Sequence, residues 1–408
     1  MILFRRLKPL YKSPLVRHCS QIVQKDPPNR LLNALGAKIR FTGPITVAEY
    51  MKECLTNPLY GYYAKHEVFG ASGDFVTSPE VSQMFGECLG IWYAHEWIKM
   101  GKPQPWQFVE LGPGKGTLMS DILRTIHNLV PDIKGALTHV HLVEVSDRLQ
   151  KVQKTTLCPT QDPPSTPYGQ KVTWHRDLSQ IPDLFTFFLA HEFFDALPIH
   201  KFVKTDGVWR EVLIDCDKDG QLTFVKSRHP TPACSYIIQD QSDCQETEIC
   251  PLAGMYTQLM SDKVDQFGGA ALIADYGHNG DKGDTLRGFR NHSVVDPLKD
   301  PGLNDLTADV DFNYLARNCS EHVRLFGPVP QKQFLLRLGL QQRLAQLIKS
   351  TQEPSAQKQL LSAFQKLTED MGQCFKFSAV FPKSMEVIHA SEPPAGFEPT
   401  EQNPSEPR

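Results

Sequence analysis

The feature that most constrains the fold of this chain is a short glycine-rich segment, FVELGPGKGTLMSDIL, at residues 108–123. An apolar run ends in Glu110, three glycines follow at alternate positions, and the apolar residues after them recur at helical spacing. A strand, a tight turn and a helix in this order are typical of α/β proteins that hold a ligand at the end of a strand. The first question is therefore which ligand this turn accommodates.

Further strands and helices alternate along the chain and predict a Rossmann-like α/β core over residues 106–382. We expect helices in the segment 26–105, ahead of this core and over the cofactor site. Insertions on the substrate side are expected at about 200–265, where a β-hairpin is predicted, and at 278–350. A Pro- and Glu-rich tail, 391–408, is predicted to be disordered. The core strands are predicted at 107–111, 139–145, 171–174, 184–190, 268–277 and near 374–381.

Composition excludes several classes of function. Net charge is −3 and 22% of residues are charged, so no overall basic field favours nucleic acid. The longest apolar runs fall far short of the roughly 20 residues of a membrane span, so no integral span is predicted. The ten cysteines form no CxxC pair or zinc-spaced cluster, so we expect free thiols and no metal site.

The first 25 residues are basic and contain no acidic residue before Asp26. Arginine and lysine interrupt each apolar stretch, so a secretory signal is not predicted. The segment 1–25 is instead typical of a mitochondrial transit peptide, with a disordered basic tail as the alternative.

The spacing of the three glycines separates the possible ligands. A dinucleotide fingerprint needs its third glycine at position 117, where this chain has Thr117. A Walker loop needs Ser or Thr directly after Gly-Lys, but here a glycine follows the lysine at 115. GxGxG after an acidic strand end suits S-adenosylmethionine, because backbone can approach the ligand and no diphosphate must be housed. Glu110 is a candidate for the ligand's ammonium group. A tight turn without a ligand remains the alternative. The candidate cofactor contacts in this segment are Glu110, Gly112, Gly114, Gly116 and Thr117.

Two further strand ends carry candidate nucleoside ligands. Glu144 follows the second predicted strand and is placed to accept both ribose hydroxyls, as acids also do in NAD enzymes. Asp177 follows the third strand and is placed to bond the adenine amino group, with Leu178 beside the ring. Since parallel strands end at one edge of a sheet, these residues predict a nucleoside site at its switch point.

Two acids three residues apart, Glu192 and Asp195, follow the strand whose end faces the transferred group in a methyltransferase fold. The [DN]PP[YFW] motif that amino and amide methyltransferases often carry is absent from this position. Paired carboxylates suit a guanidinium acceptor, which stays protonated in water and presents a planar fork of donors. We predict both acids to be catalytic, with a buried structural turn as the alternative. The polar, Gly-rich segment after strand 268–277 adds His278 and Arg287 as candidate substrate contacts.

Seven segments in order resemble one known family, the MidA family of mitochondrial protein arginine methyltransferases that serve complex I assembly. The resemblance spans roughly residues 40–382 and rests on several specific motifs. The segments are 73–87, 110–118, 141–146, 190–198, 274–278, 283–292 and 300–312.

The resemblance implies an S-adenosyl-L-methionine-dependent methyltransferase of the mitochondrial matrix. It implies symmetric dimethylation of an arginine on a quinone-side core subunit of complex I. It also suggests that Gly73, Thr77 and Ser78 pack over the cofactor, although a capping-box helix start at Thr77 and Glu80 accounts for the same sequence. Family members often carry Asn at position 191, where this chain has His191, so the resemblance assigns that residue no role.

Two other classes of function stay open. An assembly chaperone could retain a methyltransferase fold without needing turnover, although it would not need the full set of strand-end residues. A small-molecule methyltransferase is the third hypothesis, and a small amine acceptor is compatible with the sequence.

Overall fold

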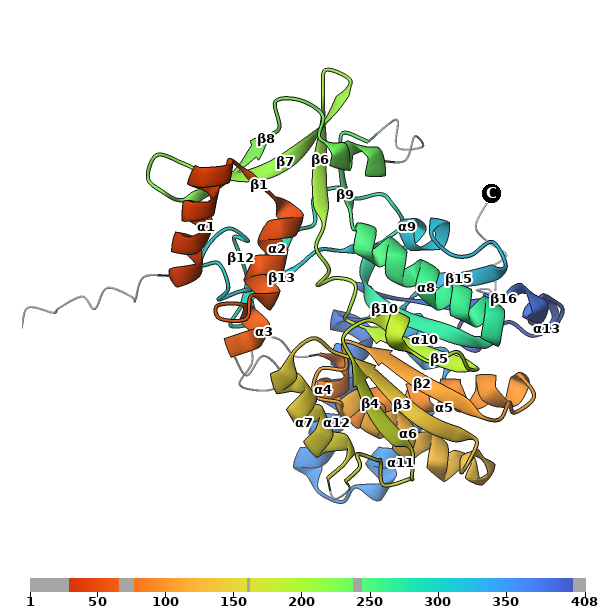
Figure 1. The fold of residues 1–408 in the computed structure, drawn as a ribbon. Coiled ribbons are helices and arrows are strands. Elements are labelled where there is room, and N and C mark those ends of the chain that lie inside the picture. Colours follow the sequence, from red (N-terminus) through yellow and green to blue (C-terminus); the bar gives the residue numbers. More distant parts are fainter. Residues whose placement is uncertain (1–28, 66–76, 160–161, 238–243, 399–408) are drawn as a thin grey trace, which may run out of the picture.

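The computed structural model describes residues 29–65, 77–159, 162–237 and 244–398. The predicted transit peptide therefore lies outside the described residues. The core is an eight-stranded sheet in the order β15-β16-β10-β5-β2-β3-β4, with β14 paired to β10 (Figure 1). Its strands are β2 (Trp106–Leu111), β3 (Leu137–Val143), β4 (Lys171–His175), β5 (Thr186–His191), β10 (Gly269–His278), β14 (Val310–Asp311), β15 (Val323–Pro330) and β16 (Phe375–Pro382).

The direction of the strands confirms the predicted Rossmann-like core. Each neighbouring pair from β4 through β10 is parallel, whereas β16 runs antiparallel to both β10 and β15. From β2 the chain moves outward through β3 and β4, then returns to β5 on the other side of β2. The sheet order therefore reverses between β2 and β5, and the crevice at the carboxyl ends of these strands is where such sheets bind ligands.

Helices cover both faces of the core sheet (Figure 1). On one face α5 (Gln83–Lys99), α6 (Thr117–Leu129) and α7 (Asp147–Leu157) enclose a large apolar cluster that includes Phe108 of β2. On the other face α8 (Pro251–Phe267) encloses a second cluster that includes the next residue, Val109. Because both faces are buried, the strands read as continuous apolar runs.

A second lobe is inserted between β5 and α8. The predicted hairpin is present as β7 (Val208–Cys216) and β8 (Leu222–Lys226), and it belongs to a five-stranded antiparallel sheet. The other strands of this sheet are β1 (Ile45–Thr46), β6 (His200–Thr205) and β9 (Glu246–Ile249). The short 3-10 helix Pro232–Tyr236 packs on β7.

The N-terminal helices pack mainly on this lobe and not over the core. Helices α1 (Arg30–Thr42) and α2 (Val47–Thr56) share a third apolar cluster with Ile214 of β7 (Figure 1). The placement of the helical segment 26–105 over the cofactor site stays a prediction, and α1 and α2 of that segment pack on the inserted lobe. The apolar periodicity predicts the apolar face of each helix, but it does not predict the surface on which that face packs. The remaining helices of the segment are α3 (Tyr62–Lys65), α4 (Ser78–Val81) and α5.

The region expected as an insertion at 278–350 is divided by β15, a strand of the core sheet. Before β15 lie a small three-stranded sheet and α9 (Phe312–Arg317). The strands of the small sheet are β11 (Arg287–Arg290), β12 (Ser293–Val295) and β13 (Asp305–Thr307). After β15 follow α10 (Gln331–Arg337), α11 (Leu340–Ser350), α12 (Pro354–Gln365) and the π-helical turn Lys366–Asp370. Within the described ranges, no helix has the length and apolar character needed to cross a membrane.

The beginning of the expected disordered tail is packed on the core. After α13 (Glu386–Ser391), the ring of Phe397 is buried 5.4 Å from that of Phe334. Trp92 Nε1 donates to the carbonyl of Ala395, whose own N–H donates to the buried carboxylate of Glu96. Residues 391–398 therefore depart from the prediction, because one aromatic anchor and two backbone bonds outweigh a Pro- and Glu-rich composition.

Candidate active site

The glycine-rich segment forms the predicted turn between β2 and α6. Gly112, Gly114 and Gly116 have φ angles of 63°, 53° and 80°, a left-handed region that favours glycine. A Cβ on Gly112 would lie 2.9 Å from the ring of Phe193, so side chains would also obstruct the turn. Gly116 occupies the N-cap position of α6 and Thr117 begins the helix. The turn thus brings backbone and a helix N-terminus to the sheet's carboxyl edge.

Glu110 is buried one residue before the end of β2. Its Oε2 has no hydrogen-bond partner among the described residues, and burial raises the pKa of the carboxyl to about 8. A buried carboxyl without a partner is costly, and a bound ammonium group would remove that cost. Glu110 therefore fits the ammonium end of the expected cofactor.

Glu144 lies directly after β3 and is held in a fixed orientation. Its Oε1 accepts the backbone N–H of Ser146 at 2.7 Å, and its Oε2 accepts Nε2 of Gln153 at 3.2 Å. Burial raises the pKa of Glu144, and these donors oppose the rise by favouring the carboxylate. The remaining lone pairs of the two oxygens suit ribose hydroxyls.

Asp177 and Leu178 lie just after β4. Asp177 Oδ1 accepts the N–H of Ser179 at 2.8 Å, and this bond lowers the pKa of its half-exposed carboxyl. The side chain of Leu178 is fully buried in the apolar cluster between the sheet and α8. Asp177 thus stands at the edge with the other acids, whereas the Leu178 side chain packs into the core.

Gln153 of α7 is a site residue that the sequence analysis missed. Its side chain is fully buried, and its Nε2 donates to the carbonyl of Gly114 at 2.8 Å as well as to Glu144. Its Oε1 accepts Nε1 of Trp174 at 2.8 Å. The amide of Gln153 therefore links the glycine turn to the carboxylate of Glu144. A signal exists in the sequence, since Gln153 shares a helical face with the buried Leu157 four residues later.

The acid pair lies on a strained turn at the end of β5. Glu192 has a φ angle of 50°, unusual for a residue with a side chain, and its carboxyl is almost buried. Its Oε1 lies 3.4 Å from the N–H of Ser78 and 3.4 Å from His191 Nε2. Asp195 is also buried, three residues further on. Burial and the charge of Asp195 raise the pKa of Glu192 well above its usual range.

Asp275 of β10 holds this turn in place and was also missed. Its Oδ2 accepts the backbone N–H groups of Phe193, Phe194 and Asp195 at 3.2, 2.9 and 3.3 Å. Burial raises the pKa of Asp275, and the backbone donors act against that rise. The sequence signal is an acid near the end of the neighbouring parallel strand, where it faces the turn after β5.

Helix α4 contacts both the glycine turn and the acid pair. Gly73 lies outside the described residues, Thr77 precedes α4, and Ser78 is buried at its start. The expected Thr77 capping bond is absent: the side chain that caps the long helix is that of Ser82, which accepts the N–H of Met84. Lys115 of the glycine turn pairs with Glu80 of α4 at 3.2 Å. Thr77 and Ser78 therefore lie beside the acid pair, and their contact with the cofactor stays a prediction.

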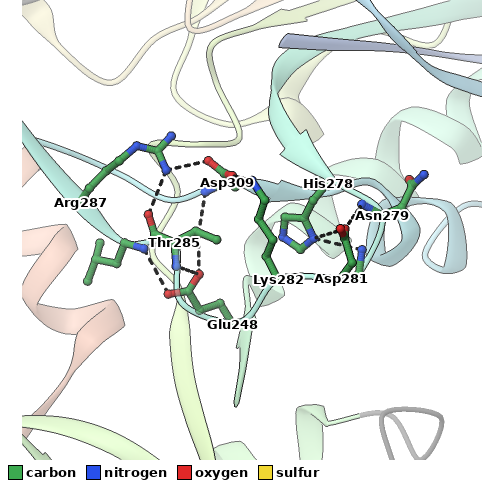
Figure 2. A network of polar contacts seen from close by, with 10 residues as sticks. Glu248, His278, Asn279, Asp281, Lys282, Thr285, Arg287 and Asp309 are labelled. Atoms are coloured by element: carbon green, nitrogen blue, oxygen red, sulfur yellow. Dashed lines mark hydrogen bonds and ion pairs between the residues drawn. The ribbon is translucent and has the colours of Figure 1, made fainter. Parts of the chain in front are cut away.

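His278 and Arg287 line one cavity of about 740 Å³ next to the end of β10. Arg287 Nη1 pairs with Asp309 Oδ1 at 2.7 Å (Figure 2). The guanidinium carbon of Arg287 lies 5.7 Å from the ring centre of Tyr276. Glu192 and Asp195 do not line this cavity. The charges of both acids nevertheless act on Tyr276, which does line it, so the cavity and the acid pair are neighbours.

The chain matches a family of S-adenosyl-L-methionine-dependent methyltransferases over residues 88–329. It is 45% identical to the mitochondrial protein arginine methyltransferase NDUFAF7 of Xenopus tropicalis, over 90% of this chain and 89% of that protein. Identity to the NDUFAF7 of Homo sapiens is 46%, over 88% and 85% of the two chains.

A solved structure has the same fold. A Burkholderia thailandensis protein bound to S-adenosyl-homocysteine is 25% identical, covers 91% of this chain and 93% of its own, and has a TM-score of 0.72. The acidic edge, the glycine turn and these comparisons agree on one assignment. The chain belongs to the family of S-adenosyl-L-methionine-dependent methyltransferases that includes the mitochondrial protein arginine methyltransferases NDUFAF7.

Proposed function

We propose that this protein is a mitochondrial S-adenosyl-L-methionine-dependent protein-arginine methyltransferase whose acceptor guanidinium is received by Glu192 and Asp195. The observation that carries the proposal is the strained turn at the end of β5, which holds the buried Asp195 and the almost buried Glu192 beside the carboxyl edge that would hold the cofactor. The names of the relatives support arginine as the acceptor and the mitochondrion as the location. The acid-free basic segment 1–25 agrees with import.

The resemblance to the MidA family supports the finer parts of the proposal. We infer that the product is symmetric dimethylarginine, that the acceptor is a quinone-side core subunit of complex I, and that its methylation serves assembly of the complex in the matrix. The cavity lined by His278 and Arg287 would contact the chain that carries the acceptor arginine. Its charged and aromatic lining suits a polypeptide segment.

The cofactor would lie along the carboxyl edge of β2, β3 and β4. Glu110 would bind its ammonium group, the glycine turn with Thr117 would hold its methionine part, and Glu144 would hold its ribose. Asp177 would meet the adenine, while Gly73, Thr77 and Ser78 would close over it. When bound, the cofactor supplies an electrophilic methyl group.

The two acids would then orient the acceptor and take its proton. A guanidinium gives up one N–H proton and gains one methyl group, so it ends with the same charge. The carboxylates of Glu192 and Asp195 would bind the planar fork, aim one nitrogen at the methyl group, and accept the proton at Glu192. Two negative charges at one buried turn match a cationic acceptor and disfavour a neutral one.

Methyl transfer from labelled cofactor tests the proposal. Protein lacking residues 1–25 would be mixed with mitochondrial extract from cells without this protein, and the labelled protein would then be hydrolysed with acid. Symmetric dimethylarginine in one complex I subunit is the expected product. Label in another amino acid would contradict the acceptor. Unlabelled protein despite retained cofactor binding would favour an assembly chaperone or a small-molecule acceptor.

A further inference from the structure

His191 is the last residue of β5 and directly precedes Glu192 of the acid pair. Neither the fold nor the proposed reaction gives this histidine a role. Its ring centre lies 5.1 Å from that of Phe85 of α5 and 6.2 Å from that of Phe375 of β16, almost parallel to the latter. These rings exclude water, and burial lowers the pKa of the imidazole to about 3. The side chain is therefore neutral at physiological pH.

One nitrogen of the imidazole lies near the acid pair. Among the residues that the structure describes, His191 Nε2 is buried and has no hydrogen-bond partner. It lies 3.4 Å from Oε1 of Glu192. Buried polar atoms without partners are rare and costly, so this one calls for an explanation. Catalytic hydrogen bonds are often long without substrate and shorten in the reactive complex.

Among the residues that the structure describes, the charged groups that act most strongly on Glu192 are acids, so a hydrogen-bond donor would help to keep it ionised. They come from its own turn, from β10, from β13 and from α4. The groups are Asp195, Asp275, Asp305 and Glu80, with the phenol of Tyr276 also near. One backbone N–H, that of Ser78, lies at 3.4 Å. Burial and these acids both favour the protonated form of Glu192, which is unable to accept a proton from the acceptor.

We propose that His191 is a positioning residue whose neutral Nε2–H donates to Glu192 Oε1, keeping that carboxylate ionised and aimed at the acceptor guanidinium. The inference rests on the proposed function for its consequence, but its geometry does not. Glu192 alone takes the proton released when the nitrogen gains the methyl group. His191 neither gains nor loses a proton, since its aromatic surroundings disfavour the imidazolium.

The test compares two substitutions of His191 with a matched control. His191→Phe removes the donor and keeps a ring between Phe85 and Phe375, whereas His191→Gln places an amide N–H near the position of Nε2. His389→Phe is the control, because His389 is also buried, with an unpaired Nε2, between Phe326 and Phe381. Thermal unfolding and cofactor affinity would establish that each variant is folded.

The first readout is the titration of Glu192 by NMR of protein labelled at glutamate carboxyl carbons, with its signal assigned by Glu192→Gln. We expect its apparent pKa to rise by about one unit in His191→Phe, to return toward the wild-type value in His191→Gln, and to stay unchanged in His389→Phe. This readout does not depend on turnover, so it tests the inference even if methyl transfer is absent.

The second readout is the pH dependence of kcat/KM. Because Glu192 must be ionised to accept a proton, activity rises with pH through its pKa, and the acidic limb should move upward by the same amount in His191→Phe. An unchanged Glu192 titration in folded His191→Phe protein would overturn the inference. An equal shift in His389→Phe would also overturn it, by showing a general effect of core substitution.

Discussion

At the scale of single residues, the left-handed conformation of Glu192 supports its proposed role, because such strain persists where the surroundings enforce it and clusters at functional sites. We expect Glu192→Gln to lower kcat by about 100-fold or more, since it removes the acceptor's counter-charge and proton acceptor. Cofactor affinity should stay within about twofold. Steady-state kinetics and calorimetric titration measure both. Glu321→Gln, at an exposed acid, is the control, and normal turnover of Glu192→Gln would remove this acid from the mechanism.

The buried carboxyl of Glu110 predicts proton release on ligand binding. With a pKa of about 8 the free protein is mostly protonated there at pH 7, whereas an ammonium group requires the carboxylate. Binding of S-adenosyl-L-homocysteine at pH 7 should therefore release about one proton. Calorimetry in two buffers of different ionisation enthalpy counts it. Glu110→Gln should bind more weakly and release none, and equal release from the variant would place the proton elsewhere.

Gln153 should matter for affinity although it need not contact the ligand. Gln153→Leu fills a similar volume but leaves the Gly114 carbonyl, one Glu144 oxygen and the Trp174 N–H without their partner. We expect cofactor affinity to fall about tenfold, roughly one buried hydrogen bond. Gln150→Leu is the control, since the Gln150 side chain donates to the Glu144 carbonyl and, in the part of the chain that the structure describes, to neither Gly114 nor the Glu144 carboxylate. Equal losses in both variants would argue against a specific role for Gln153.

The sequence predicts a site residue when the end of a strand positions it, and it does not when packing between distant elements positions it. Glu110 lies at the end of one strand, and Glu144 and Asp177 each follow another. The edge where parallel strands end is a property of topology, so the neighbourhood of these acids could be predicted. Gln153 and Asp275 act across elements, on a turn or acid from another part of the chain. Their role depends on which atoms meet after packing, and a pattern in one sequence does not contain that information.

At the scale of elements, one carboxylate of β10 organises the turn after β5. Asp275→Ala should destabilise the protein by about 3 kcal/mol or more, because three buried N–H groups lose their acceptor. Asp275→Asn keeps one acceptor oxygen and should cost less, while still slowing methyl transfer through a displaced Glu192. Urea unfolding gives the first quantity. Equal stability of the alanine variant and wild type would contradict this account.

Elements themselves were predicted better than their partners. Six of the eight core strands lie within a few residues of expectation because their apolar runs are strong, whereas β14 and β15 were not predicted. Helix starts were less certain, since Thr77 and Ser82 both precede suitable sequences and the structure uses Ser82. The placement of α1 and α2 on β7 could not be predicted, because any exposed apolar surface would have satisfied their faces.

At the scale of the whole molecule, the packed segment 391–398 predicts how the chain tolerates truncation. Removing residues 391–408 exposes the site of Phe397 and removes the hydrogen bonds that Trp92 and Glu96 make to Ala395, so we expect a melting temperature lower by about 5 °C or more. Removing 399–408 deletes none of these contacts and should change it by about 1 °C at most. Differential scanning calorimetry compares them, and equal effects would mean that this segment contributes little.

The inserted lobe separates two parts of the molecule, each built on its own sheet. The cofactor edge is built from β2, β3 and β4, whereas the chain passes from β5 through Glu192 and Asp195 straight into β6 of the lobe. The acids therefore lie where the half of the molecule that would hold the cofactor joins the half that would meet the acceptor. Changes in the lobe could adapt such an enzyme to a new acceptor protein while the residues at the other edge stay as they are. In a mitochondrial lineage whose acceptor protein changed, we expect the first matching substitutions in the strands around β7.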